Sequence, residues 1–174
     1  MHLPRLRDAQ EVFALIDRHR DALGEWLPWV GETLSAGDTE AFFRKVREWH
    51  AEERALHLLI RQDGHAAGMV GMHVLDRRNG KTSFGYWLAP TYWGRGLVTR
   101  AVGRLLRFAF EEEGLQRAEI RCAPENARSR AVAERLGFRL EGQLRCAERL
   151  SGDRCVDHLV FGLLRSEWRS GTAS

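Results

Sequence analysis

A glycine-containing segment, residues 88–99, holds the residues whose types and spacing are best suited to chemistry. It joins an expected strand to an expected helix and carries Gly94 and Gly96 with one residue between them. Glycine has no Cβ, so successive backbone N–H groups can converge there on one anion. The helix that follows adds free N–H groups and a positive dipole end, and Arg95 and Thr99 offer further donors. The segment predicts a pyrophosphate site that needs no metal; the structural alternative is a sharp strand-to-helix turn.

Familiar nucleotide motifs and nucleophile arrangements do not fit the chain. The glycine segment lacks the Gly-Lys-Ser/Thr ending of a Walker A loop. Thr99 stands where the dinucleotide fingerprint requires its third glycine. Ser129 has no evident His-Asp relay, and Asp157 and His158 are strand neighbours that point to opposite faces. We therefore expect chemistry without a covalent enzyme intermediate.

The cysteines give no sign of a disulfide framework or a metal site. Cys122, Cys146 and Cys155 contain no Cys-x-x-Cys pair, and their number is odd. We expect three small core residues in a reducing compartment, and no metal.

The composition is that of one soluble domain spanning residues 1–174. Apolar residues make up 44% of the 174 and charged residues 29%, which excludes a disordered or fibrous protein. No apolar run approaches the roughly 20 residues of a membrane span, and no secretory signal is evident, so a cytoplasmic protein without membrane contact is expected. The net charge is +3, with basic residues dispersed among acidic ones. That pattern favours an anionic small ligand or an acidic partner over nucleic acid.

Hydrophobic periodicity predicts a mixed α/β sheet with helices on its faces. Helices are expected at residues 8–23, from a cap at Asp38, at 97–113 and at 127–136. Strands are expected at residues 56–60, 67–75, 83–88, 118–122, 138–150 and 155–164. Residues 78–81 predict a two-residue hairpin turn, and residues 151–153 predict the turn between the last two strands.

Several of these motifs together resemble the Gcn5-related N-acetyltransferase superfamily, and within it the branch of ribosomal-protein N-terminal acetyltransferases. The resemblance runs from about Arg7 to Trp168. Its motifs are Arg20–Trp29, Gly85–Leu88, Tyr92–Thr99, Asn126–Ser129 and Leu136–Gly142. It implies a mostly antiparallel twisted sheet of about six or seven strands, with a splayed central pair that holds acyl-CoA.

The resemblance also implies the residues that bind the acyl donor, acetyl-CoA or another acyl-CoA. The pyrophosphate would lie on Trp93, Gly94, Arg95, Gly96, Leu97, Val98 and Thr99. Backbone groups of Leu88 would meet the pantetheine and polarise the thioester, and Asn126 would contact CoA or order its turn. Trp93 and Val98 depart from the superfamily pattern but fit the branch.

Direct acyl transfer needs a base for the amine and stabilisation of the leaving thiolate. Many superfamily members use a tyrosine seven residues after the asparagine, where this chain has Ala133. The branch instead implies Ser129 at the thiolate, where it would also contact CoA, and Glu148 as general base, directly or through water. The structural alternatives are an ordinary helix start capped by Asn126 and a strand carboxylate paired with a neighbouring arginine.

On the acceptor side, Trp29 and Tyr86 are the candidate substrate contacts, although each also suits a core or strand-face role. The expected acceptor is a primary amine, such as the α-amine of a protein or peptide. A small-molecule amine is the alternative within the same class, and a non-catalytic acyl-CoA-binding module is the alternative outside it. Homodimers are common in the family that the chain resembles.

Overall fold

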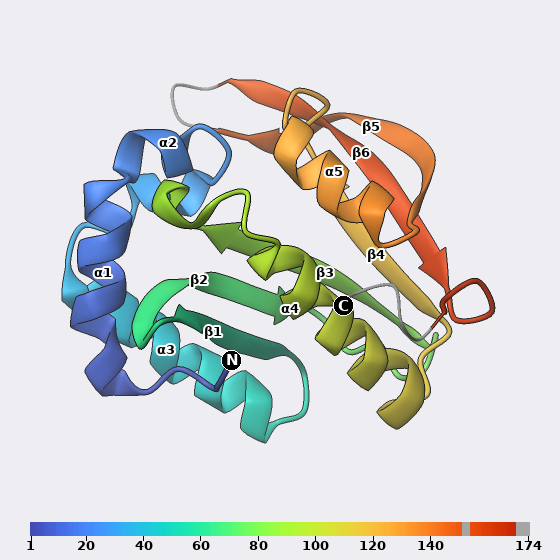
Figure 1. The fold of residues 1–174 in the computed structure, drawn as a ribbon, viewed down its shortest axis with the longest axis horizontal. Coiled ribbons are helices and arrows are strands. Elements are labelled where there is room, and N and C mark those ends of the chain that lie inside the picture. Colours follow the sequence, from blue (N-terminus) through green and yellow to red (C-terminus); the bar gives the residue numbers. More distant parts are fainter. Residues whose placement is uncertain (151–153, 170–174) are drawn as a thin grey trace.

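The computed structural model describes residues 1–150 and 154–169, which form one six-stranded sheet with helices on both faces (Figure 1). The strand order is β1-β2-β3-β4-β6-β5. Every neighbouring pair is antiparallel except β3 and β4, which are parallel. The expected mixed and mostly antiparallel sheet is thus confirmed. The strands are β1 (Leu56–Gln62), β2 (His65–Met72), β3 (Lys81–Leu88), β4 (Arg117–Cys122), β5 (Arg139–Arg149) and β6 (Cys155–Leu164).

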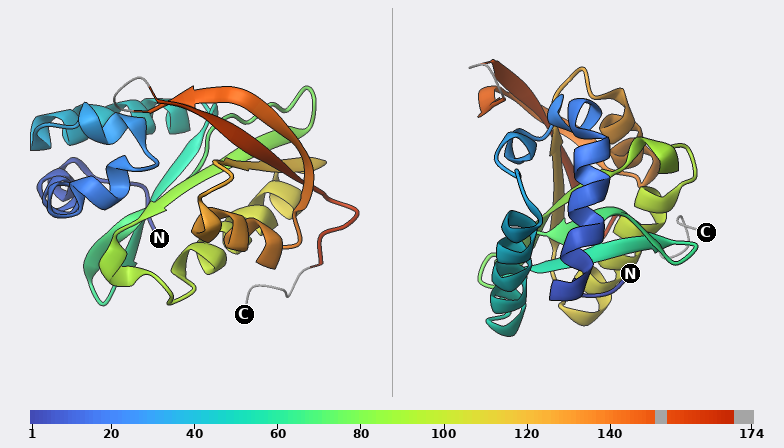
Figure 2. Two further views of the ribbon diagram at one scale, coloured as in Figure 1. Left: turned by 90° about the horizontal axis from the view of Figure 1, so that it is seen from above. Right: turned by 90° about the vertical axis from the view of Figure 1, so that its left-hand side faces the viewer.

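The helices divide between the two faces, as Figures 1 and 2 show. One face carries α1 (Ala9–Arg18) and α3 (Ala36–Ala51), and the other carries α4 (Leu97–Arg107) and α5 (Ala127–Arg135). Side chains alternate between the faces along each strand, so Leu59 packs with the α1 cluster and Ile60 with the α4 cluster. Two hydrophobic cores result, one on each side of the sheet.

The parallel pair β3 and β4 opens at its C-terminal end. Its pairing runs from Lys81 with Arg117 to Phe84 with Ile120 and goes no further. Residues 85–88 of β3 are therefore not paired with β4. This opening confirms the predicted splayed central pair.

The helix boundaries on the α1 face differ from the prediction. The helix expected at residues 8–23 divides at His19, where φ is −119°, into α1 and the short α2 (Arg20–Gly24). The α3 helix starts at Ala36 and not at a cap on Asp38. Ser35 is the N-cap, because its hydroxyl accepts the Asp38 N–H and the Asp38 carboxylate accepts the Ser35 N–H.

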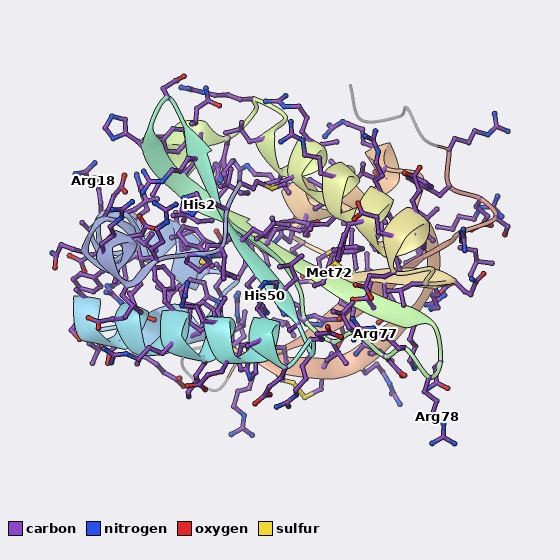
Figure 3. The ribbon with its side chains drawn as sticks, turned by 90° about the horizontal axis from the view of Figure 1, so that it is seen from below. His2, Arg18, His50, Met72, Arg77 and Arg78 are labelled. Carbon is purple, nitrogen blue, oxygen red and sulfur yellow. A yellow bond between two sulfur atoms is a disulfide. The ribbon has the colours of Figure 1, made fainter. Side chains whose placement is uncertain are left out.

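The β2–β3 connection and the end of α4 also differ. Strand β2 ends at Met72, and an isolated bridge joins Asp76 to Lys81, so the connecting turn is longer than two residues. Arg78 projects from this turn into the solvent (Figure 3). The predicted helix at residues 97–113 is α-helical to Arg107 and continues as a π-helix, Phe108–Glu112.

The cysteine expectation was wrong for two of the three residues. Cys122 is buried and free, as expected. Cys146 and Cys155 are exposed and form a disulfide between β5 and β6. Strand pairing brings these two residues together, and their sequence spacing alone does not reveal it. The turn predicted at residues 151–153 lies outside the described residues.

None of the helices in the described part of the chain combines the length and the apolar character that crossing a bilayer requires.

Candidate active site

The glycine loop before α4 has the geometry of an anion site. Gly94 and Gly96 have φ values of 75° and 69°, a left-handed conformation that disfavours residues with a side chain. Gly96 is the N-cap of α4, and the first helical hydrogen bond runs from Arg100 N–H to the Gly96 carbonyl. The N–H groups of residues 97–99 therefore have no acceptor within the helix. These N–H groups can donate hydrogen bonds to a bound anion.

A cleft of about 600 Å³ lies beside this loop, between the end of β3, α4 and α5. Nine of the ten residues predicted to bind the acyl donor line it: Leu88, Trp93, Gly94, Gly96, Leu97, Val98, Thr99, Asn126 and Ser129. Arg95 is the exception, since its guanidinium lies over the Tyr92 ring, 5.6 Å from the centroid. The Leu88 carbonyl accepts the Trp93 indole N–H at 2.7 Å, so that oxygen already has a donor.

Two arginines of α5 that the sequence analysis missed also line the cleft. The Arg128 guanidinium lies 3.9 Å from the centroid of the Trp93 ring, and Arg135 donates to the Thr99 hydroxyl at 3.1 Å. They are seven residues apart, which places them on one face of a helix. That spacing is the signal that could have identified them. Together they make the cleft attractive to a polyanion.

A second cavity, of about 980 Å³, lies on the other side of the splayed strands. Its lining is aromatic and acidic, and both Trp29 and Glu148 belong to it. Trp29 packs against Trp87 with 5.9 Å between ring centroids. Six residues line this cavity and the cleft alike: Trp26, Leu27, Tyr86, Trp87, Asn126 and Ser129. The two spaces therefore meet at these residues, of which Tyr86, Asn126 and Ser129 carry polar side-chain groups suited to the reaction.

Tyr86 and Ser129 form a hydrogen-bonded pair where the cleft and the second cavity meet. The Tyr86 hydroxyl lies 3.0 Å from the Ser129 hydroxyl and 3.2 Å from the Ser129 carbonyl oxygen. Burial raises the pKa of Tyr86 above its usual range, so the phenol keeps its proton and remains a donor. The Asn126 side chain accepts the Ser129 N–H at 3.0 Å and caps α5. The capping alternative for Asn126 is thus present, and it fixes the turn that carries Ser129.

Glu148 lies on β5, and its side chain lines the second cavity. Its Oε2 is 3.2 Å from Nε2 of His158 on β6. The sequence analysis correctly placed Asp157 and His158 on opposite faces, but it did not foresee this pair. A change of strand register between Leu144 and Glu148 creates it, and the sequence carries no clear signal of that change.

Two other carboxylates of this cavity, Glu119 and Asp38, already have strong partners. Glu119 receives hydrogen bonds from Arg117 and Arg121, and although burial raises its pKa, these bonds bring the net value below the usual range. Asp38 completes the capping box of α3, and hydrogen bonds from Ser35 and Leu34 lower its pKa. Both groups are therefore held as carboxylates by structural contacts, which makes Glu148 the better candidate for a base.

Among residues 1–150 and 154–169, no group of three or more His, Cys, Asp and Glu side chains is placed to hold a metal ion.

Comparison with known proteins decides the family. A family model described as an acetyltransferase (GNAT) domain matches residues 1–139. This chain belongs to the GNAT acetyltransferase family. It is an N-acetyltransferase, and the superfamily that its motifs indicated is confirmed.

Relatives of this GNAT acetyltransferase include acetyltransferases that are named for ribosomal substrates. The chain is 36% identical over 164 residues to "Putative ribosomal N-acetyltransferase YdaF" of Bacillus subtilis (strain 168), covering 93% of this chain and 88% of that protein. It is 26% identical over 151 residues to the ribosomal-protein-serine acetyltransferase of Escherichia coli (strain K12), covering 87% and 84%. The microcin C7 self immunity acetyltransferase MccE, solved with acetyl-CoA and AMP, has a TM-score of 0.89 and 30% identity, covering 93% and 89%.

Proposed function

We propose that this GNAT acetyltransferase moves an acetyl group from acetyl-CoA to the α-amine of a ribosomal protein, by direct transfer at the point where its two cavities meet. The observation that carries the proposal is the shared lining of Tyr86, Asn126 and Ser129. A donor in one space and an acceptor in the other would have their reactive ends side by side. Such positioning removes much of the entropic barrier to acyl transfer.

The cleft beside α4 supplies what the acyl donor needs. Its loop offers the pyrophosphate the free N–H groups of residues 97–99 and the positive end of α4. Arg128 and Arg135 add positive charge from α5. The pantetheine would then follow the end of β3 near Leu88 toward Ser129. The structural relative MccE was solved with acetyl-CoA, which supports acetyl-CoA as the donor.

Glu148 and Ser129 would act on opposite sides of the thioester. An ammonium acceptor loses a proton to Glu148, and its nitrogen attacks the carbonyl carbon as the C–N bond forms. The C–S bond breaks next, and the Ser129 hydroxyl, which lies 3.0 Å from the Tyr86 hydroxyl, donates to the leaving sulfur. The nitrogen loses two protons: Glu148 takes the first and releases it to solvent, and the second replaces the proton that the Ser129 hydroxyl gives to the sulfur, so each turnover releases one proton.

The acceptor cavity favours the end of a peptide over a very small amine. Its volume of about 980 Å³ lies at the upper end of the range for small-molecule pockets, which leaves room beyond the amine for further residues. The acidic lining attracts a protonated amine, and Trp29 offers an apolar wall. The two ribosomal relatives point in the same direction. A cytoplasmic location and a homodimer remain predictions that accompany this function.

The test is incubation of the enzyme and acetyl-CoA with a pool of peptides that represent the N-termini of ribosomal proteins. We expect CoA thiol to be released and mass spectrometry to find acetyl groups on α-amines. Peptides whose α-amine is already blocked, with lysine side chains left free, serve as the control. Acetylation of polyamines with no modified peptide would favour the small-molecule alternative. CoA binding without thiol release from any amine would favour the non-catalytic one.

A further inference from the structure

The proposed base, Glu148, is held by a single imidazole from the neighbouring strand. Its Oε2 lies 3.2 Å from Nε2 of His158. The His158 side chain is only 16% exposed, whereas that of Glu148 is 38% exposed. Both side chains line the acceptor cavity. One carboxylate oxygen is therefore engaged inside the protein, and the group as a whole remains accessible to an acceptor.

A bulge in β5 creates this contact. Leu144 pairs with His158, and a regular antiparallel ladder continuing from that pair would set Glu148 opposite Arg154. Glu148 instead pairs with Val156, two positions nearer to His158. Val156 and His158 lie on the same face of β6, so the register change brings the carboxylate within reach of the ring.

Two contacts stabilise this bulge, and both lie on the face of the strands opposite to Glu148 and His158. Cys146 has a φ of 49°, and its N–H donates to the Asp157 carboxylate at 2.8 Å. The Cys146–Cys155 disulfide joins β5 to β6 within two residues of Glu148. Bulges beside active sites commonly re-aim a side chain. Here the re-aimed side chain is the one that the proposed reaction needs as a base.

We propose that His158 is a positioning residue for Glu148: its Nε2–H donates to Oε2 and leaves Oε1 directed to the acceptor amine. This inference rests on the function proposed above. A single hydrogen bond from an imidazole restricts one carboxylate oxygen of Glu148 and leaves the other oxygen to face the acceptor. Glu119 shows the contrast, because its two arginine partners hold it as an ionised structural group. The other charged groups that line this cavity include Arg121, Asp38 and Glu32.

The test is a double-mutant cycle on thiol release with an α-amino peptide. His158→Leu removes the donor, and we expect kcat to fall about 10- to 100-fold, the range for losing a hydrogen bond to a charged group. KM for acetyl-CoA should stay unchanged, because His158 does not line the donor cleft. His158→Gln keeps an N–H donor and should recover most of the rate. In a Glu148→Gln background, His158→Leu should cost no more than about twofold, because the base that His158 positions is already lost.

His50→Leu is the matched control, since this histidine is exposed on α3 and lines neither cavity. Equal losses from His158→Leu in both backgrounds, or no recovery by His158→Gln, would overturn the positioning role. If His158→Leu does not fold, His158→Phe, which also removes the N–H donor, takes its place in both backgrounds and is judged in the same way. A wild-type enzyme that releases no thiol overturns the proposed function, and the inference with it. A wild-type enzyme that depends on Glu148 but not on His158 overturns the inference alone.

Discussion

Replacing Gly94 by alanine tests whether the loop before α4 holds phosphate oxygens. Gly94 has a φ of +75°, where an L-residue costs about 1–2 kcal/mol relative to its usual conformation. The added Cβ would meet no heavy atom within 4 Å, so no steric clash adds to that cost. We therefore expect the free energy of unfolding to fall by about 1–2 kcal/mol in denaturant titrations.

The effect on ligand binding should be larger than this strain explains. The new methyl group stands at the edge of the cleft, where the proposed pyrophosphate approaches the backbone. Losing one N–H hydrogen bond to a charged oxygen costs about 1.5–3 kcal/mol. That corresponds to a CoA Kd about 10- to 100-fold higher, which isothermal titration calorimetry can measure.

Gly64→Ala is a matched control within the same chain. Gly64 lies in the turn between β1 and β2, has a φ of +82° and also has no heavy atom within 4 Å of an added Cβ. It lines neither cavity. We expect a similar loss of stability with an unchanged CoA Kd. Equal CoA affinities for the two variants would refute the phosphate site at this loop.

Three further predictions concern the base, the disulfide and a buried histidine. Glu148→Gln keeps the shape but removes the proton acceptor, so kcat should fall about 100- to 10,000-fold with CoA affinity unchanged in calorimetry; a fall of less than about threefold would exclude Glu148 as the base. Denatured, unreduced protein should titrate as one thiol, that of Cys122, because Cys146 and Cys155 are joined across nine positions of sequence. After reduction, all three cysteines should titrate as thiols, and the free energy of unfolding should be lower by about 2–3 kcal/mol. Three thiols before reduction would show that the disulfide is absent. Burial lowers the pKa of His57 from 6.5 to about 4, so the unfolded chain binds more protons in that range and stability should fall as the pH drops from 6.5 toward 4. The decline should be shallower in His57→Phe, and identical pH profiles in denaturant titrations would contradict the burial effect.

The elements that local patterns specify were predicted well from the sequence. Apolar periodicity placed α4 and α5, and strand-like runs placed all six strands to within a few residues. Boundaries were less certain where two capping groups compete. Asp38 is a good cap by type, but Ser35 takes the position because the pair forms a reciprocal box.

The candidate site likewise contains residues that local sequence patterns predicted and contacts that they could not predict. The glycine loop is local, so Gly94 and Gly96 could be recognised from type and spacing alone. The pair of Glu148 and His158 depends on the register between two strands, and one bulge changes which residues meet. The Cys146–Cys155 disulfide depends on the same pairing. Contacts of this kind follow from the assembled sheet and not from sequence spacing.

A crystal structure with desulfo-coenzyme A would show where the acyl donor binds. We expect the pyrophosphate oxygens to accept from backbone N–H groups between Gly94 and Thr99, and the pantetheine to end beside the Ser129 hydroxyl. The ligand bound elsewhere, or a cleft left vacant at saturating concentration, would show that this loop does not hold the acyl donor.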